Sequence, residues 1–110
     1  MEKLRIYQKS LDLVIQIYSL IGNNPIIAKD YSLNDQLRRA AISIVANIAE
    51  GYCRTGKQFQ HYLQISSGSA NETVALLQIV ALVHKINTVS LQEEFRVLVK
   101  QINSFSNTLN

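Results

Sequence analysis

The chain has little glycine, almost no proline and a single cysteine, and each shortage removes a class of fold or site. Four glycines and one proline among 110 residues are too few for the many turns of an all-β protein, so the composition favours helices. The lone Cys53 excludes an intramolecular disulfide and a cysteine-rich zinc site. It is also the cysteine usage expected in a reducing cytoplasm.

Long apolar runs are missing as well. Charged residues interrupt the first ten positions, which argues against a signal peptide. No run approaches the roughly 20 apolar residues needed to span a bilayer, so we expect no membrane partner. Hydrophobic residues still make up 47% of the chain, enough for one packed core in a single domain, 1–110.

The net charge is only +3, with a pI near 9.2. A pI above about 9 is compatible with nucleic-acid binding, but a charge this small is weak evidence by itself. Residue pattern therefore has to carry the functional argument.

Apolar residues recur at alternating steps of three and four in four segments, which predicts four amphipathic helices. They cover residues 2–21, 32–50, 57–84 and the stretch from about residue 90 onward. Short links between them favour an all-α, antiparallel up-and-down four-helix bundle. The predicted core seams are Leu4, Tyr7, Leu11, Val14, Tyr18, Ile21; Leu37, Ala40, Ala41, Ile44, Val45, Ile48; Phe59, Leu63, Ser66, Ala70, Thr73, Leu77, Val80, His84; and Leu91, Phe95, Leu98, Ile102, Phe105, Leu109.

Helix ends and small residues give further local predictions. Ser32 is suited to cap the second helix, and Ser90 with Glu93 has the pattern of a capping box for the fourth. Gly51 should end the second helix. Gly68 lies inside the third predicted helix, where glycine costs about 1 kcal/mol relative to alanine, so we expect another helix to approach closely there.

Three of the helices carry more apolar surface than one seam uses. Behind the seams lie second apolar stripes, made of Ile6, Leu13, Ile17 and Leu20; Ile42, Ala46 and Ala49; and Tyr62, Ile65, Leu76, Ile79 and Val83. Either the geometry of a small domain hides these stripes, or the protein associates with itself. We favour a homo-oligomer, because monomers rarely expose large apolar patches.

A line of polar residues also repeats about once per turn along the second helix: Gln36, Arg39, Ser43, Asn47 and Glu50. It is either a solvated stripe or part of a hydrogen-bonded seam. We predict the seam, in which Ser69 and Glu72 of the third helix join these residues, within the chain or across a subunit interface.

The run QLRRAAISIVANIAEG (residues 36–51), followed by Arg54, Phe59, Leu63 and Gly68-Ser69-Ala70-x-Glu72, resembles the four-helix-bundle family of 23S rRNA intervening-sequence proteins. The resemblance extends over nearly the whole chain. Two departures are visible. Val45 stands where the family usually has proline, and Pro25, Ile26 and Lys29 replace its usual Phe-Pro and acidic residue before the second helix.

The resemblance implies a bacterial, cytoplasmic bundle that assembles into a homopentameric barrel with a central channel. It implies no enzymatic activity and no cofactor. Members are similar in fold to the accessory protein of diversity-generating retroelements, a basic pentamer that works with a reverse transcriptase and nucleic acid. The present chain lacks the strong basicity of that relative.

No residue constellation predicts catalysis or metal binding. His61 and His84 have no His or carboxylate at four-residue spacing, and Cys53 has no plausible base. Glu50 and Glu72 are conceivable as paired catalytic carboxylates. Ion pairs with nearby arginines are the preferred interpretation, so we predict a protein that is not an enzyme and has no metal.

One basic set remains as a binding candidate: Arg38, Arg39, Arg54 and Lys57, with the aromatic Tyr52 between them. Arginine beside an aromatic ring can hold phosphate and stack on a base, although such residues also form solvated or intersubunit salt bridges. Two hypotheses follow. One is an oligomeric adaptor that associates with RNA or DNA, and the other is a scaffold for a protein partner such as a reverse transcriptase.

Overall fold

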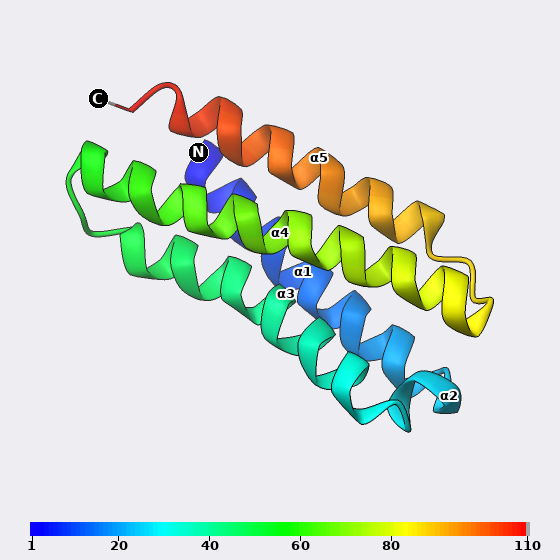
Figure 1. The fold of residues 1–110 in the computed structure, drawn as a ribbon. Helices are drawn as coiled ribbons and strands as arrows, with labels where there is room; N and C mark the ends of the chain where they lie inside the picture. The colour runs from blue at the N-terminus through cyan, green and yellow to red at the C-terminus, as the bar shows by residue number, and fades with distance from the viewer. Residues whose placement is uncertain (110) are drawn as a thin grey trace.

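The computed structural model describes residues 1–109, and within them the chain is all-α, with five helices and no strand. The helical class predicted from composition and periodicity is therefore confirmed. The helices are α1 (Glu2–Gly22), α2 (Pro25–Ala28), α3 (Tyr31–Gly51), α4 (Gly56–His84) and α5 (Val89–Ser106). Figure 1 shows the four long helices side by side, with the single turn of α2 at one end.

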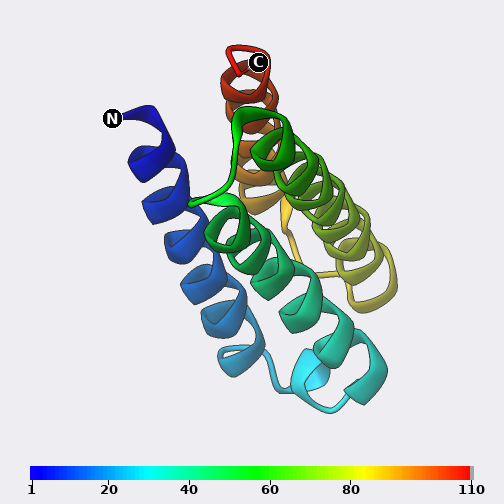
Figure 2. The same cartoon turned by 90° about the vertical axis from the view of Figure 1, so that its left-hand side faces the viewer.

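The domain is elongated, about 44 × 20 × 19 Å, because the axes of the four long helices are roughly aligned. The most extensive contacts join α3 to α4 and α4 to α5, and α1 completes the arrangement by packing on α3 and, less closely, on α5. Figure 2, seen from the end that holds both termini, shows α1 diverging from α5 at that end.

Two predicted helix caps were wrong. The cap of α3 is Asp30 rather than Ser32, because the helix begins two residues earlier and Asp30 Oδ1 accepts the Leu33 amide at 3.4 Å. The capping box at Ser90 does not form, since α5 begins at Val89 and Ser90 lies inside it. The side chain of Thr88 donates instead to the Leu77 carbonyl at 2.7 Å, which ties the start of α5 to α4.

The core stripe of α1 also differs from the prediction. The buried residues are Ile6, Ser10, Leu13, Ile17 and Ile21, whereas Leu4, Leu11 and Tyr18 of the predicted seam are exposed. Both stripes have helical spacing and both are apolar, so periodicity alone could not select one. Packing against α3 and α5 selects the stripe that contains Leu13.

The other predicted seams lie largely in the core. In α4 the residues from Phe59 to Val80 on the predicted seam are buried, and in α5 the central Phe95, Leu98 and Ile102 are fully buried. Within the described residues, every buried side-chain nitrogen or oxygen has a hydrogen-bond partner. Burial of polar side chains in the core therefore leaves no hydrogen-bonding group of these residues unsatisfied.

Close helix approach occurs at Gly51 and not at Gly68. A Cβ atom on Gly51 would lie 2.7 Å from Phe59 Cδ1 and 3.0 Å from Tyr62 Cβ, so only glycine lets α3 end this close to α4. A Cβ atom on Gly68 would meet nothing within 4 Å, because this residue faces outward. The close approach of another helix expected at Gly68 therefore does not occur within the chain.

Candidate interaction surfaces

The outer side of α1 and α3 is an apolar surface, which we call the α1–α3 face. It holds two shallow hollows of about 270 and 280 Å³. The first is lined by Leu11, Val14, Ile42, Val45 and Ala46, and the second by Leu4, Tyr7, Ala49 and Tyr52. Ile15, beside them on α1, is 64% exposed. The stripe predicted as core of α1 thus forms much of an exposed apolar face.

Tyr52 belongs to the α1–α3 face and not to a basic patch. Its ring packs edge-on against Tyr7 at 6.5 Å and lies 6.3 Å from the ring of Phe59. The ammonium group of Lys3 sits 4.6 Å from the centre of the Tyr52 ring. The structure therefore separates Tyr52 from the arginines with which the sequence grouped it.

A second exposed stripe runs along α4, and we call it the α4 ridge. Its members recur at steps of three and four, and every one of them is exposed: Ile65, Gly68, Glu72, Ala75, Ile79 and Leu82. The most exposed of its large apolar side chains is Leu82, at 72%. The stripe is apolar apart from Glu72, so the domain presents two separate apolar surfaces.

Three residues of the predicted polar network lie together in the seam between α3 and α4. The hydroxyl oxygens of Ser43 and Ser69 are 2.8 Å apart, and Asn47 Nδ2 donates to the Ser43 carbonyl and hydroxyl at 2.8 and 3.1 Å. Deeper in the same seam, Ser66 Oγ donates to the Ile44 carbonyl at 2.8 Å. These bonds fix how α3 and α4 sit against one another.

The remaining members of the network are not joined to these three within the chain. Gln36 donates to Ser32 at 3.0 Å, and Arg39 pairs with Asp35 at 2.8 Å, both one turn back along α3. Glu50 pairs with Arg54 at 3.0 Å. Glu72 is exposed, and its side chain forms no hydrogen bond or ion pair among residues 1–109.

The predicted basic set is split between the two halves of the molecule. Arg38 and Arg39 share the carboxylate of Asp35, at 3.7 and 2.8 Å, in the first half of α3. Arg54 and Lys57 flank the connection to α4, beyond the other end of α3. From Arg39 to the last residue of α3, Gly51, the helix rises about 18 Å at about 1.5 Å per residue, and Arg54 lies beyond that end. The four cations therefore do not form one patch.

The connection between α3 and α4 builds a more local cationic site, which we call the α4 entry hollow. It has a volume of about 350 Å³ and is lined by Arg54, Lys57, Gln58, His61 and Tyr62. The Arg54 guanidinium lies 5.3 Å from the centre of the Tyr62 ring, and the His61 ring packs edge-on against that tyrosine at 5.4 Å. The hydrogen bond that Arg54 donates to the Glu50 carboxylate raises the pKa of Arg54, so the guanidinium stays charged.

Sequence reasoning missed Gln58, His61 and Tyr62 as members of this site. The available signal was their spacing, since Lys57 and His61, and likewise Gln58 and Tyr62, are four residues apart and share a helix face. His61 was assessed only as a metal ligand, for which it lacks partners. Residues 1–109 contain no group of three His, Cys, Asp or Glu side chains that could hold a metal ion.

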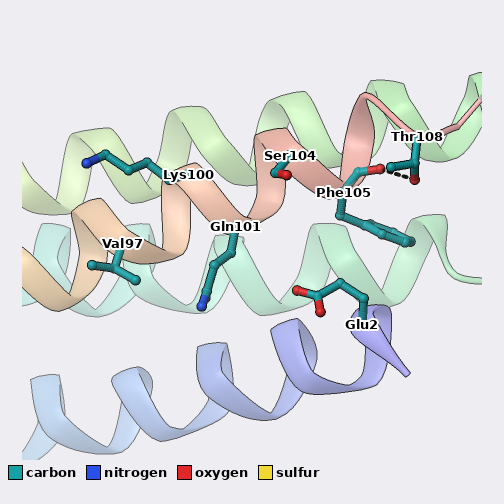
Figure 3. Close-up of a pocket in the computed structure, with 7 residues that line it drawn as sticks. All are labelled: Glu2, Val97, Lys100, Gln101, Ser104, Phe105 and Thr108. Carbon is teal, nitrogen blue, oxygen red and sulfur yellow. Dashed lines mark hydrogen bonds between the residues drawn. The ribbon is translucent and has the colours of Figure 1, made fainter.

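Two other features have ordinary structural roles. A hollow of about 490 Å³ lies between α5 and the start of α1, and Figure 3 shows Glu2 facing Gln101 and Phe105 across it. Elsewhere, His84 Nε2 lies 2.9 Å from Asp30 Oδ2 and links the end of α4 to the start of α3. No helix in the described part of the chain is both long and apolar enough to cross a membrane.

Comparisons with known proteins agree on the fold. The family model described as 23S rRNA-intervening sequence protein matches residues 2–110. A crystal structure of a protein of unknown function from the S23 ribosomal protein family of Bacteroides thetaiotaomicron superimposes with a TM-score of 0.87. The match covers 97% of this chain and 99% of that one, at 24% identity. No curated protein sequence matches the chain.

Proposed function

The chain belongs to the 23S rRNA-intervening sequence protein family, and from that premise we propose a non-enzymatic, homo-oligomeric adaptor that associates with nucleic acid. In this proposal each chain is an antiparallel up-and-down four-helix bundle. The copies, five by resemblance to the family, close into a barrel in the bacterial cytoplasm. The observation that carries the proposal is the α1–α3 face, on which Leu11, Ile15 and Ile42 are exposed.

Self-association follows from the two apolar surfaces of the domain. Contiguous apolar patches of this kind are rare on soluble monomers and mark interfaces. The α1–α3 face and the α4 ridge are different surfaces, so a contact between them is heterologous. A heterologous contact generates a ring when its rotation closes and an open filament when it does not, and the proposed barrel is the closed case.

Charge placement supports the same contact. The pairing of Ser43 with Ser69 sets the register between α3 and α4, and in this register Glu72 is level with Arg39 along the bundle. In a ring whose axis is parallel to the helices, Glu72 on the ridge of one copy therefore reaches the level of Arg39 on the next. Arg39 is 79% exposed within its own chain and is accessible to such a partner.

Assembly also strengthens attraction to nucleic acid. A net charge of +3 per chain becomes roughly +15 in a pentamer, and affinity grows with the number of phosphates contacted. Lys57 and Arg54 would be repeated at one end of the ring. We expect weak, sequence-independent binding of RNA or DNA by the oligomer.

The experiment combines light scattering with a gel-shift assay on the same preparation. The oligomer should shift a structured RNA or a DNA duplex at about 50 mM salt, and the shift should fade steeply by about 200 mM because bound counterions are released. If neither nucleic acid shifts at micromolar oligomer, the adaptor proposal fails.

The alternative is a protein-interaction scaffold for an enzyme encoded nearby, such as a reverse transcriptase, with no intrinsic nucleic-acid binding. The observation that favours it is that Arg38, Arg39 and Arg54 all have carboxylate partners within the chain. Gene neighbourhood distinguishes the two roles, because an adjacent reverse transcriptase gene points to the scaffold.

A further inference from the structure

We propose that the α4 entry hollow is a binding site for a phosphate group. This inference rests on the proposed nucleic-acid function, in which that phosphate belongs to an RNA or DNA strand, and it names the site that contacts the strand. The hollow brings two cationic side chains, an imidazole and an amide to one small concave surface beside an aromatic ring. These are the side chains that donate hydrogen bonds to phosphate oxygens.

Arg54 is held in position before any ligand arrives. Its Nε donates to the Glu50 carbonyl at 3.3 Å, its Nη2 lies 3.0 Å from Glu50 Oε2, and its guanidinium packs over the Tyr62 ring. These contacts use one edge of the guanidinium and leave the Nη1 donors available. A planar, oriented guanidinium loses less side-chain entropy on binding than a mobile one.

Lys57 and His61 supply the other donors from the first two turns of α4. They are four residues apart and therefore lie on the same face of the helix, and both are exposed. Lys57 forms no ion pair with any residue in 1–109, so its ammonium group is available to an external anion. Gln58 adds an uncharged amide donor to the lining.

The arginines in the first half of α3 lack these properties and provide an internal control. Arg38 and Arg39 share one carboxylate, that of Asp35, and Arg38 Nε also donates a hydrogen bond to Asn34 Oδ1 at 2.7 Å. Neither side chain lines any of the hollows described above. Arg39 is kept, because in the proposed ring it meets Glu72 of the next copy. Removing the Arg38 charge changes the net charge of the protein without touching the proposed site.

The experiment measures the fluorescence anisotropy of one short labelled single strand, prepared with a 5′-phosphate and with a 5′-hydroxyl. The test variant is Lys57→Ala/His61→Ala and the control is Arg38→Ala, all in the full chain. We expect the test variant to weaken binding about tenfold at about 50 mM salt and to lower the salt slope by about one per contacted phosphate. The control should weaken binding less than about twofold at the same salt concentration.

A second measurement keeps the site separate from the strand. Inorganic phosphate, added to isotope-labelled protein, should shift the amide NMR signals of residues 54–62 saturably in the parent and not in the test variant. If the parent shows these shifts but binds neither strand, the phosphate site stands and the nucleic-acid proposal fails. Tighter binding of the 5′-phosphorylated strand supports a site for the chain end, and equal binding supports a site for backbone phosphates.

Three results would overturn the inference. One is unchanged strand binding by the test variant together with weakened binding by the control, which leaves the nucleic-acid proposal intact but moves the contact to α3. Another is a phosphate titration that shifts basic residues throughout the protein rather than residues 54–62. The third is the absence of both strand binding and phosphate shifts. Circular dichroism should show unchanged helicity in both variants, because the three replaced side chains are all at least partly exposed.

Discussion

The two sides of α3 differ in whether their packing is complete within the chain. On the side facing α4, Gly51 admits Phe59, the Ser43 and Ser69 hydroxyls meet, and Ser66 satisfies the Ile44 carbonyl. On its other side, α3 contributes Ile42, Val45 and Ala46 to the α1–α3 face, where no other helix of the described chain covers them. The packing of α3 on α4 is thus completed within the chain, whereas apolar side chains on its other side remain exposed. This contrast is the physical basis for proposing assembly.

The largest expected effect comes from disrupting the packing between α3 and α4. Phe59→Ala removes a ring that is 4% exposed and packs on Tyr52 and Phe105, so we expect a loss of about 3–5 kcal/mol in the free energy of unfolding. Tyr18→Ala on the α1–α3 face, 47% exposed, should cost far less within a single chain. Urea denaturation of both variants at one protein concentration measures the difference. Equal losses would contradict the distinction between the two sides.

Two glycine substitutions compare the same change at the seam and on the ridge. Gly51→Ala should lower the free energy of unfolding by about 1–3 kcal/mol. The new methyl group clashes with Phe59 and Tyr62, and this clash costs more than the higher helix propensity of alanine contributes. Gly68→Ala meets open space and should stabilise the isolated chain by up to about 1 kcal/mol. Thermal unfolding tests both. If the α4 ridge packs against another copy, the Gly68→Ala variant should also weaken assembly.

The four long helices, their approximate bounds and most core positions could be predicted from sequence, because the spacing of residues such as Phe59, Leu63 and Leu77 is that of a helix with one buried side. The single turn of α2 (Pro25–Ala28) was missed, since four residues are too few to show a helical period. The choice between Leu11 and Leu13 could not be predicted. Both belong to equally apolar stripes of α1, and only the position of neighbouring helices decides which one is buried. The cap predictions failed for a related reason. Asp30, Ser32, Thr88 and Ser90 are all residue types that cap helices, and a shift of two residues in the helix start decides which one is the cap.

The candidate site was less predictable than the fold. Sequence proximity grouped Tyr52 with Arg54, yet the turn after Gly51 sends Tyr52 to the α1–α3 face and Arg54 toward Tyr62. The polar line on α3 was predicted as a network. Ser43, Asn47 and Ser69 meet within the chain, and the charged members find nearer partners on their own helix or, for Glu72, none among residues 1–109.

A smaller effect is expected where α3 begins. Asp30→Ala removes the acceptor for the Leu33 amide and the partner of His84, and should cost about 1 kcal/mol. Ser32→Ala, at the cap that the sequence suggested, should change the free energy of unfolding by less than about 0.5 kcal/mol. Chemical denaturation distinguishes the two, and the reverse ranking would show that Ser32 caps the helix after all.

The smallest effect on the folded chain, and the most specific test of the interface, concerns Glu72. Because Glu72 is exposed, Glu72→Ala should alter the unfolding free energy of the dissociated chain by less than about 0.5 kcal/mol. The dissociation constant of the oligomer should rise, and a double-mutant cycle with Arg39→Ala should be non-additive if the two residues meet between copies. Additive effects would separate them. A loss of about 3–5 kcal/mol in the single chain would instead require Glu72 to be paired and buried.

The most direct test of the account is the molar mass of the protein in solution, with and without charge on the α1–α3 face. Light scattering at micromolar concentration should give several times 12.4 kDa for the parent. Leu11→Glu/Ile42→Glu should give the mass of one chain with its helicity retained, while Asn103→Glu/Ser104→Glu on α5 should remain assembled. A parent that scatters as a single chain, or a Leu11→Glu/Ile42→Glu variant that stays assembled, would contradict the claim that another copy covers this face.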